Sequence, residues 1–158
     1  MWQKIKPYVL FIALSLGVGG LSALLTRDSM TVYEEIVTPA FAPPSLLFPI
    51  VWTVLYVLMG ISAALVYTNR QKASIAARDG LTLFGVSLLV NFTWSLIFFG
   101  MRAFLFASLW VLFLLILVAG TIYYYAKVSR PAALLQIPYL LWTAFATVLT
   151  VAIFFLNR

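Results

Sequence analysis

The stretch Gln136-Ile-Pro-Tyr-Leu-Leu-Trp-Thr-Ala-Phe-Ala-Thr147 lies within the last of five long apolar runs and decides how the whole chain is interpreted. Its aromatic and small side chains recur every three or four residues and therefore share one helical face, namely Tyr139, Trp142, Phe145 and Ala146. A helix that faces only lipid has no need of amide, hydroxyl and indole groups together at membrane depth. We therefore expect this face to line a pocket, for which two earlier runs supply matching aromatic faces.

The amino-acid composition is that of an integral membrane protein. Of the 158 residues, 65% are hydrophobic and 9% are charged, and the mean hydropathy is +1.09. Soluble domains are about 45–50% apolar and about 25% charged, so a soluble protein of this size could not bury so much apolar surface. The chain contains no Cys and no His, which excludes disulfides, thiolate metal sites, imidazole bases and histidine haem ligands. We expect neither a metal site nor a resident cofactor.

Each of the five apolar runs is long enough to cross a hydrocarbon core of about 30 Å. They cover approximately residues 7–25, 45–67, 80–100, 103–126 and 131–156. The sequence therefore predicts an all-α integral membrane protein, a five-transmembrane-helix bundle that forms a single domain over residues 1–158.

Small residues and prolines within these runs predict how the helices pack and bend. Close approach of a neighbouring helix is expected in the first run at Ala13, Gly17 and Gly20, and in the second run at Gly60 and Ala64. Pro138 removes a backbone donor inside the fifth run and is expected to kink the helix or to free carbonyls locally.

The basic residues are divided unevenly between the two ends of the predicted bundle. Seven lie on the side of the N-terminus, namely Lys4, Lys6, Arg70, Lys72, Arg78, Lys127 and Arg130, and three lie opposite, namely Arg27, Arg102 and Arg158. The positive-inside rule then places the N-terminus in the cytoplasm and the first loop outside the cell membrane. Because these charges stand singly at the ends of apolar runs, the net charge of +6 indicates membrane topology, and we expect no nucleic-acid partner.

The longest polar segment, residues 26–44, separates the first two apolar runs and holds three of the four acidic residues. The sequence Thr31-Val-Tyr-Glu34 has the pattern of a capping box, which predicts a short helix, and Pro39 should end it. Such a segment is either a plain connection or a lid over the bundle. Its length and its partial structure favour the lid.

Conventional catalysis and ion coupling find no support among the titratable residues. None of the fourteen charged residues falls within a predicted span, whereas ion-coupled pumps and proton relays place ionisable groups at depth. Neither a carboxylate pair nor a nucleophile–base pair is available for hydrolysis. A coupled transporter and a conventional hydrolase are therefore not expected.

The side chains at membrane depth form an aromatic, weakly polar set that suits a flat apolar ligand, held by stacking and oriented by an amide. The candidate ligand contacts are Trp52, Tyr56, Asn91, Trp94, Phe98, Tyr139, Trp142, Phe145, Ala146 and Thr147. Taken singly, the aromatic residues could serve packing alone, and Asn91 could bridge two helices. Three helices that each present Trp beside polar neighbours favour a pocket.

Four segments of this chain resemble the TspO/MBR family of tryptophan-rich sensory proteins and translocator proteins, and the resemblance covers nearly the whole chain. They are Pro39-Ala-Phe-Ala-Pro-Pro44, Val51-Trp-Thr-Val-Leu-Tyr56, Asn91-Phe-Thr-Trp94 and Pro138-Tyr-Leu-Leu-Trp-Thr-Ala-Phe-Ala146. The resemblance implies a homodimeric five-helix bundle in membrane lipid, with a pocket that opens toward the first loop. It implies porphyrins as ligands and, in animal members, cholesterol and synthetic isoquinoline and benzodiazepine drugs.

The same resemblance assigns roles to individual residues. The pocket would be lined by Trp52, Asn91, Trp94, Trp142 and Ala146, and the segment from Tyr33 to Phe41 would form the lid. Many members have Trp where this chain has Phe41, so a lid indole is absent here. The last run also lacks the Tyr of the animal cholesterol motif, and tight sterol binding at that end is not expected.

Three functions remain open on the sequence. The first is a receptor or carrier for porphyrins, linked to tetrapyrrole regulation or stress sensing. The second is a light-dependent porphyrin-degrading enzyme, in which Trp52 and Trp142 would be the catalytic electron donors and the porphyrin the substrate. The third is an uncoupled transporter of tetrapyrroles or steroids.

Overall fold

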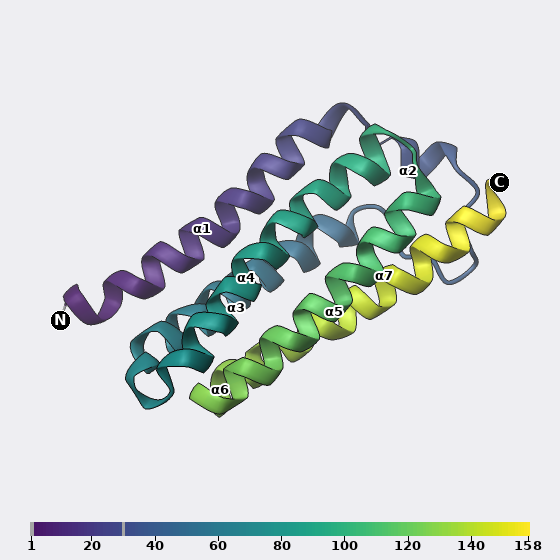
Figure 1. The fold of residues 1–158 in the computed structure, drawn as a ribbon. Helices are drawn as coiled ribbons and strands as arrows, with labels where there is room; N and C mark the ends of the chain where they lie inside the picture. Colours follow the sequence, from purple (N-terminus) through teal and green to yellow (C-terminus); the bar gives the residue numbers. More distant parts are fainter. Residues whose placement is uncertain (1, 30) are drawn as a thin grey trace.

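The computed structural model describes residues 2–29 and 31–158, and this part of the chain is helical almost throughout and contains no β-strand (Figure 1). The α-helices are α1 (Trp2–Thr26), α2 (Val32–Glu35), α3 (Leu47–Thr68), α4 (Ser74–Ser95), α5 (Phe104–Val128), α6 (Arg130–Leu135) and α7 (Ile137–Leu156). Short 3-10 turns follow α1 at Arg27–Ser29 and α3 at Arg70–Lys72, and a π-helical turn at Leu96–Gly100 extends α4.

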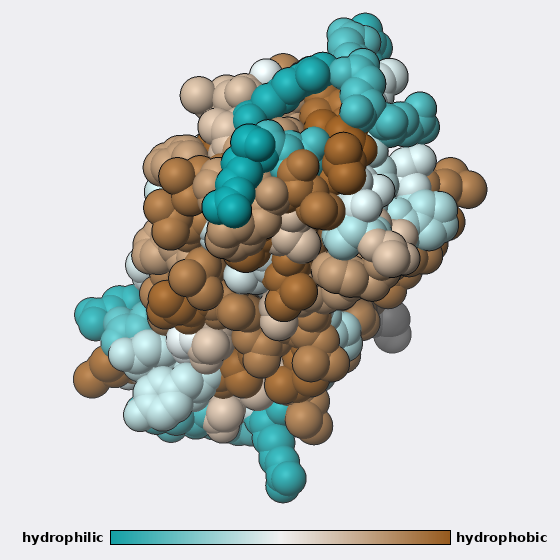
Figure 2. Space-filling model, turned by 90° about the vertical axis from the view of Figure 1, so that its right-hand side faces the viewer, coloured by the Kyte–Doolittle hydropathy of each residue, from teal (hydrophilic) through white to brown (hydrophobic). Residues whose placement is uncertain are grey.

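Five helical stretches within the described residues are long and apolar enough to span a membrane. They are α1 with its 3-10 turn, α3, α4 with its π turn, α5, and the pair α6 and α7. On the face drawn in Figure 2, hydrophobic side chains cover most of the surface and hydrophilic ones gather toward its margins. The predicted all-α bundle with five spans is confirmed.

Two of the spanning helices begin earlier than predicted. α1 starts at Trp2 rather than near residue 7, and α4 starts at Ser74 rather than near residue 80. Hydropathy marks the part of a helix that suits hydrocarbon, whereas these first turns carry charged side chains such as Lys4 and Arg78, whose long stems reach toward water. Charged residues therefore do lie within the spanning helices, near their ends.

Close packing between α1 and α3 depends on two glycines. A Cβ added to Gly60 of α3 would lie 2.5 Å from the Ile12 Cα of α1, and a Cβ on Gly19 would collide with the Tyr56 ring. The predicted close approach at Gly60 is confirmed. The prediction for Gly17 and Gly20 is wrong within the chain, because neither has a heavy atom within 4 Å of its Cβ position.

The last span is broken at Gln136, between α6 and α7. Pro138 occupies the second position of α7, where its missing N–H costs no helical hydrogen bond. The helix is therefore interrupted, and the interruption lies two residues before the proline. The Ser62 hydroxyl of α3 donates to the Ala132 carbonyl at 2.7 Å and fixes α6 against α3.

The segment between α1 and α3 lies at the end of the bundle where α7 finishes (Figure 1). The short helix α2 is present as predicted, but the capping box is not, because Thr31 has a helical backbone conformation and its side chain makes no capping hydrogen bond. Asn157 beyond α7 accepts from the Val37 amide at 3.0 Å and donates to the Val37 carbonyl at 2.8 Å. Arg102 after α4 forms an ion pair with Glu35 at 2.6 Å. The segment is thus held to the ends of two other spans.

Candidate ligand-binding site

Trp52 of α3 stands at the centre of the aromatic cluster inside the bundle. Its ring stacks on Tyr56, one helical turn further along, with ring centres 5.6 Å apart and an interplanar angle of 29°. Two side chains of α7 meet it edge-on, Tyr139 at 6.1 Å and Trp142 at 6.5 Å. These are the offset and perpendicular geometries that aromatic pairs prefer.

Trp94 of α4 brings a second aromatic group to the same place. It stacks on Phe98 at 5.4 Å, as the spacing of four residues predicts. The π-helical turn begins directly after this helix, with the Met101 amide donating to the Leu96 carbonyl at 3.0 Å. This wider turn lets Phe99 meet Trp94 as well, with ring centres 6.4 Å apart.

A small enclosed cavity lies among these rings. Its volume is about 20 Å³, and it is lined by Tyr33, Phe48, Trp52, Trp94, Phe98, Phe99, Trp142, Ala146, Leu149 and Thr150. A second cavity of about 110 Å³ adjoins it toward α1 and shares Phe48, Trp52, Trp94 and Phe99 with it. The first cavity has room for about one water molecule, whereas drug-sized ligands occupy about 300–1,000 Å³. Neither cavity has room for a ligand of that size in this structure.

Two buried polar groups at this cavity have no partner. The indole nitrogens of Trp94 and Trp142 are both buried and make no hydrogen bond to any of the described residues. By contrast, the indole of Trp110, outside the cavity, donates to the Val90 carbonyl at 3.1 Å and to the Thr93 hydroxyl at 2.9 Å. The Thr150 hydroxyl already donates its hydrogen bond to the Ala146 carbonyl. Behind Trp52, the buried Tyr139 hydroxyl is likewise without a partner in the described part of the chain. The two indoles and this hydroxyl all offer donors, which suit a ligand with oxygen acceptors.

The segment before α3 contributes one residue, Tyr33, to the lining of the first cavity. Tyr33 lines the first cavity and meets Phe48 edge-on at 5.1 Å, and Phe48 in turn meets Trp142 at 5.9 Å. The Tyr33 hydroxyl donates to the Pro43 carbonyl at 2.9 Å. Partial burial raises the pKa of the Tyr33 phenol, so this donor keeps its proton. Phe41 is half exposed and covers Phe145 at 6.4 Å rather than lining the cavity.

Most of the predicted site residues meet at this place. Five line the first cavity, namely Trp52, Trp94, Phe98, Trp142 and Ala146, and Tyr56 lines the second. Phe145 packs against Trp142 at 5.4 Å, and Tyr139 is fully buried behind Trp52. Thr147 donates its hydroxyl to the Thr143 carbonyl within α7.

Asn91 lies behind the cavity wall and connects two helices. It is buried, and its amide donates to the Tyr56 hydroxyl at 2.8 Å, which joins α4 to α3. It is absent from the residues that line either cavity in this structure. The geometry thus favours the interhelical bridge, the alternative that the sequence left open.

Four residues that line the first cavity are missing from the predicted set. Phe48 precedes Trp52 by one turn, and Leu149 and Thr150 follow Ala146 by three and four residues, so their helical faces could have been read from the spacing. The position of Phe99 could not be predicted from the spacing. Phe99 faces the cavity because it lies in the π-helical turn, whereas in a regular α-helix its side chain would point away from the cavity.

These features define an α-helical integral membrane protein with five spans and a tryptophan-lined internal cavity. A family model described as "TspO/MBR family" matches residues 11–156, which contain every residue of the site, and the chain belongs to that family. Two relatives named "Tryptophan-rich protein TspO" are similar over nearly their whole length. The one from Chlorobaculum tepidum is 37% identical over 99% of both chains, and the one from Archaeoglobus fulgidus is 36% identical over 98% of this chain and 99% of its own. The human "Translocator protein" is 33% identical over 94% of this chain and 86% of its own.

Proposed function

We propose that this protein is a membrane receptor or carrier for porphyrins of the protoporphyrin IX type and for related flat apolar ligands. The observation that carries the proposal is the convergence of Trp52, Trp94 and Trp142, from three different helices, on one enclosed cavity. A flat macrocycle offers two faces and a long edge to such rings, and aromatic contacts of this kind add to the gain from burial. Membership of the TspO/MBR family supports the same ligand class.

The unpartnered indole donors give the proposed ligand its orientation. Trp94 and Trp142 each hold a buried N–H without an acceptor. A porphyrin with propionate side chains supplies carboxylate oxygens, and hydrogen bonds to a charged acceptor are the stronger ones. The binding of such a ligand would therefore satisfy both donors.

Porphyrin binding requires the site to open. A cavity of about 20 Å³ cannot hold a macrocycle, so side chains at its mouth have to move. Tyr33 and Phe48 are the natural moving parts, because Tyr33 belongs to the segment between α1 and α3 and Phe48 to the first turn of α3. The contacts that hold this segment down, Glu35 with Arg102 and Val37 with Asn157, are exposed and weak enough to exchange.

The binding proposal is tested by fluorescence quenching in darkness, with purified protein in lipid. Protoporphyrin IX and its dimethyl ester are compared on the wild type and on Trp94→Phe/Trp142→Phe, which keeps two aromatic rings and removes both N–H groups. We expect the variant to lose about tenfold or more in affinity for the free acid, since a hydrogen bond to a charged group contributes about 1.5–3 kcal/mol. Affinity for the ester should fall less.

Trp110→Phe is the matched control, because this indole is already hydrogen-bonded outside the cavity. It should leave porphyrin affinity unchanged. Equal losses in Trp110→Phe and in the double variant would contradict the assignment of the site, and so would a wild type that does not quench at all.

Light-driven porphyrin degradation is a second candidate, favoured by one contact. Trp52 and Trp142 lie edge to face with ring centres 6.5 Å apart. When one indole loses an electron, the other is therefore close enough to supply a replacement. A photoexcited porphyrin takes one electron from an indole and passes it to dissolved oxygen, which becomes superoxide. The indole radical cation would then regain its electron from the porphyrin, and the porphyrin radical cation would combine with superoxide, so that oxygen is the net oxidant of the macrocycle. The protein's part would be to hold the porphyrin against the two rings.

Illumination of the bound porphyrin separates this activity from binding alone. We expect Trp142→Phe to slow the loss of the porphyrin spectrum per bound molecule, because Phe cannot donate the electron, and removal of oxygen should stop it. Undiminished loss in Trp52→Phe/Trp142→Phe would end the enzymatic alternative and leave the receptor proposal untouched.

A further inference from the structure

Among the described residues, α1 is the one spanning helix whose side chains form no hydrogen bond or ion pair with another part of the chain. The two hydrogen bonds that its side chains make are internal. Ser15 donates to the Phe11 carbonyl and Thr26 to the Ser22 carbonyl, each one turn back along α1. By contrast, side-chain hydrogen bonds join α3 to α4, α4 to α5, and α3 to α6 in the last span. α1 is therefore held to the bundle by packing alone.

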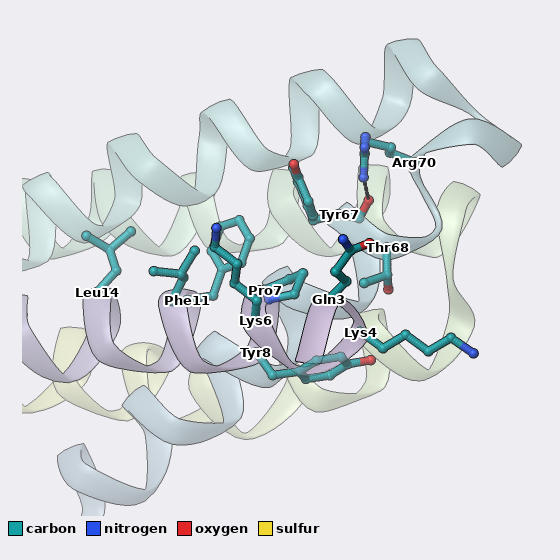
Figure 3. Close-up of a pocket in the computed structure, with 11 residues that line it drawn as sticks. Gln3, Lys4, Lys6, Pro7, Tyr8, Phe11, Leu14, Tyr67, Thr68 and Arg70 are labelled. Carbon is teal, nitrogen blue, oxygen red and sulfur yellow. Dashed lines mark hydrogen bonds between the residues drawn. The ribbon is translucent and has the colours of Figure 1, made fainter. Parts of the chain in front are cut away.

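The closest of these packing contacts fall in the middle of α1. The Phe11 ring meets Tyr67 at 5.8 Å and Phe84 at 6.4 Å, and the two glycine contacts with α3 involve residues 12 and 19 of α1. Toward the N-terminus, a groove of about 1030 Å³ separates the first turns of α1 from the end of α3, as Figure 3 shows. Toward the other end of α1, the second cavity lies between this helix and the bundle.

The second cavity reaches the surface of the bundle at membrane depth. Ala23 of α1 and Pro49 of α3 both line it, both are exposed, and both belong to spanning helices. On its inner side the second cavity shares four aromatic walls with the first, namely Phe48, Trp52, Trp94 and Phe99. The second cavity therefore lies between the surrounding lipid and the aromatic cavity.

The glycine-rich sequence Gly17-Val-Gly-Gly20 lies directly before this part of α1. Gly17 and Gly20 face open space, so they do not serve packing within the chain. Glycine weakens a helix because it adds backbone freedom, and sharp bends in helices are found at glycine-containing sequences. α1 can therefore bend here, with residues 21–26 moving together.

Movement of residues 21–26 away from the bundle breaks few interactions. No side-chain hydrogen bond to another helix is lost, and Thr26 keeps its bond within α1. Apolar surface that leaves a helix interface in a membrane meets hydrocarbon and not water, so separation costs packing contacts without a hydrophobic penalty. Leu21, Leu24 and Leu25 are already exposed on this part of α1.

We propose that the second cavity is a lateral passage, through which ligands dissolved in the bilayer reach the aromatic cavity when α1 bends at its glycines. Resting on the porphyrin-binding function proposed above, the passage gives the same site a second class of ligand, namely apolar tetrapyrroles such as porphyrin esters that partition into lipid. Porphyrins with free propionates stay at the water boundary and enter beside Tyr33. For a ligand in the lateral passage, the shared rings of Phe48 and Phe99 have to turn aside.

Stopped-flow fluorescence in proteoliposomes tests the passage with protoporphyrin IX dimethyl ester. Association is followed as tryptophan quenching, and dissociation as the loss of tryptophan-sensitised porphyrin emission after a chase with the non-fluorescent iron porphyrin ester. Gly17→Ala/Gly20→Ala stiffens α1 without a clash and should slow both rates at least about threefold. The equilibrium affinity for the ester should stay unchanged, and protoporphyrin IX free acid should associate as fast as with the wild type.

Gly85→Ala is the matched control, because Gly85 of α4 also faces open space. It should exchange the ester at the wild-type rate. Equal ester rates in the control and in Gly17→Ala/Gly20→Ala would overturn the lateral passage and leave the proposed function standing. Equal slowing of ester and free acid would also overturn it, because α1 would then control an opening common to both ligands. A wild type that binds neither porphyrin would overturn the proposed function and the passage together.

A second substitution acts on the passage directly. Ala23→Phe places a ring where the second cavity reaches the surface and should slow association and dissociation of the ester together. Ala13→Phe adds the same ring at an exposed position of α1 outside the cavity and should leave both rates unchanged. Faster dissociation of the ester from Ala23→Phe at an unchanged association rate would make the second cavity part of the binding site, and would overturn its role as a passage.

Discussion

Asn91 connects α4 to α3 through a single buried hydrogen bond, whose acceptor is the Tyr56 hydroxyl. The Tyr139 hydroxyl nearby is also buried and has no partner. An amide surrounded by hydrocarbon cannot hydrogen-bond to water instead, so this bond fixes which faces of α3 and α4 meet. Because Tyr56 also stacks on Trp52, the bond sets the position of the central indole of the cavity.

Asn91→Ala should lower the stability of the ligand-free protein. The loss is expected to be about 0.6–2 kcal/mol, the range of interhelical hydrogen bonds in membranes, and it should appear as a lower melting temperature. The porphyrin-induced rise in melting temperature should persist, because Asn91 does not line the closed cavity.

A double-mutant cycle with Tyr56→Phe isolates this bond from other effects of the substitutions. The two losses should be less than additive in Asn91→Ala/Tyr56→Phe. Strict additivity, or an unchanged ligand-free melt together with a vanished porphyrin shift, would instead make Asn91 a ligand contact.

Two glycines position α1 against α3, Gly60, which the sequence predicts, and Gly19, which it does not. α1 meets α3 where Gly60 leaves room for the Ile12 backbone. We expect Gly60→Ala to destabilise the protein by about 1–3 kcal/mol, since the new methyl group would meet backbone that cannot rotate away. Gly17→Ala, in open space on the same pair of helices, should leave the melting temperature unchanged or slightly raised. Equal effects of the two substitutions would contradict the packing described here.

The segment between α1 and α3 should gate the cavity through its contact with α7. Asn157→Ala removes both hydrogen bonds to Val37 and is expected to increase the association rate of protoporphyrin IX severalfold in stopped-flow quenching. Asn69→Ala is the matched control, because it removes an amide that bonds the Leu65 carbonyl at the opposite end of the bundle. An unchanged association rate in Asn157→Ala would mean that porphyrin reaches the cavity by another route.

Much of the site followed from spacing, and the remainder depended on backbone details. The stacked pairs of Trp52 with Tyr56 and of Trp94 with Phe98 are four residues apart on regular helices, so the sequence predicts them directly. The packing face of α1 could not be predicted, because this helix is apolar nearly all round. Gly19 packs against Tyr56 of α3 and the adjacent Gly20 faces open space, and no sequence pattern distinguishes the two. The size of the cavity depends on how Phe48 and its neighbours fill it, which no periodicity encodes.

At the scale of the whole molecule, five spans place the two ends of the chain at opposite ends of the bundle (Figure 1). The basic residues predict that the turn after α3 lies in the cytoplasm and that the segment after α1 lies outside. Single cysteines introduced at Ser74 and Ser29 should therefore react with a membrane-impermeant thiol reagent from opposite sides, Ser29→Cys in intact cells and Ser74→Cys only after permeabilisation. Reaction of both in intact cells would contradict this orientation.

The hydrogen bonds between Asn157 and Val37 also have a practical consequence for how this protein is labelled. With a fluorescent protein or affinity tag fused directly after Arg158, only Arg158 would separate the tag from Asn157, whose amide bonds the segment between α1 and α3. We expect such a fusion to alter the proposed entry of porphyrin in the same way as Asn157→Ala, so that association rates measured with it would include an effect of the tag. A reporter that leaves entry undisturbed needs a long flexible spacer after Arg158.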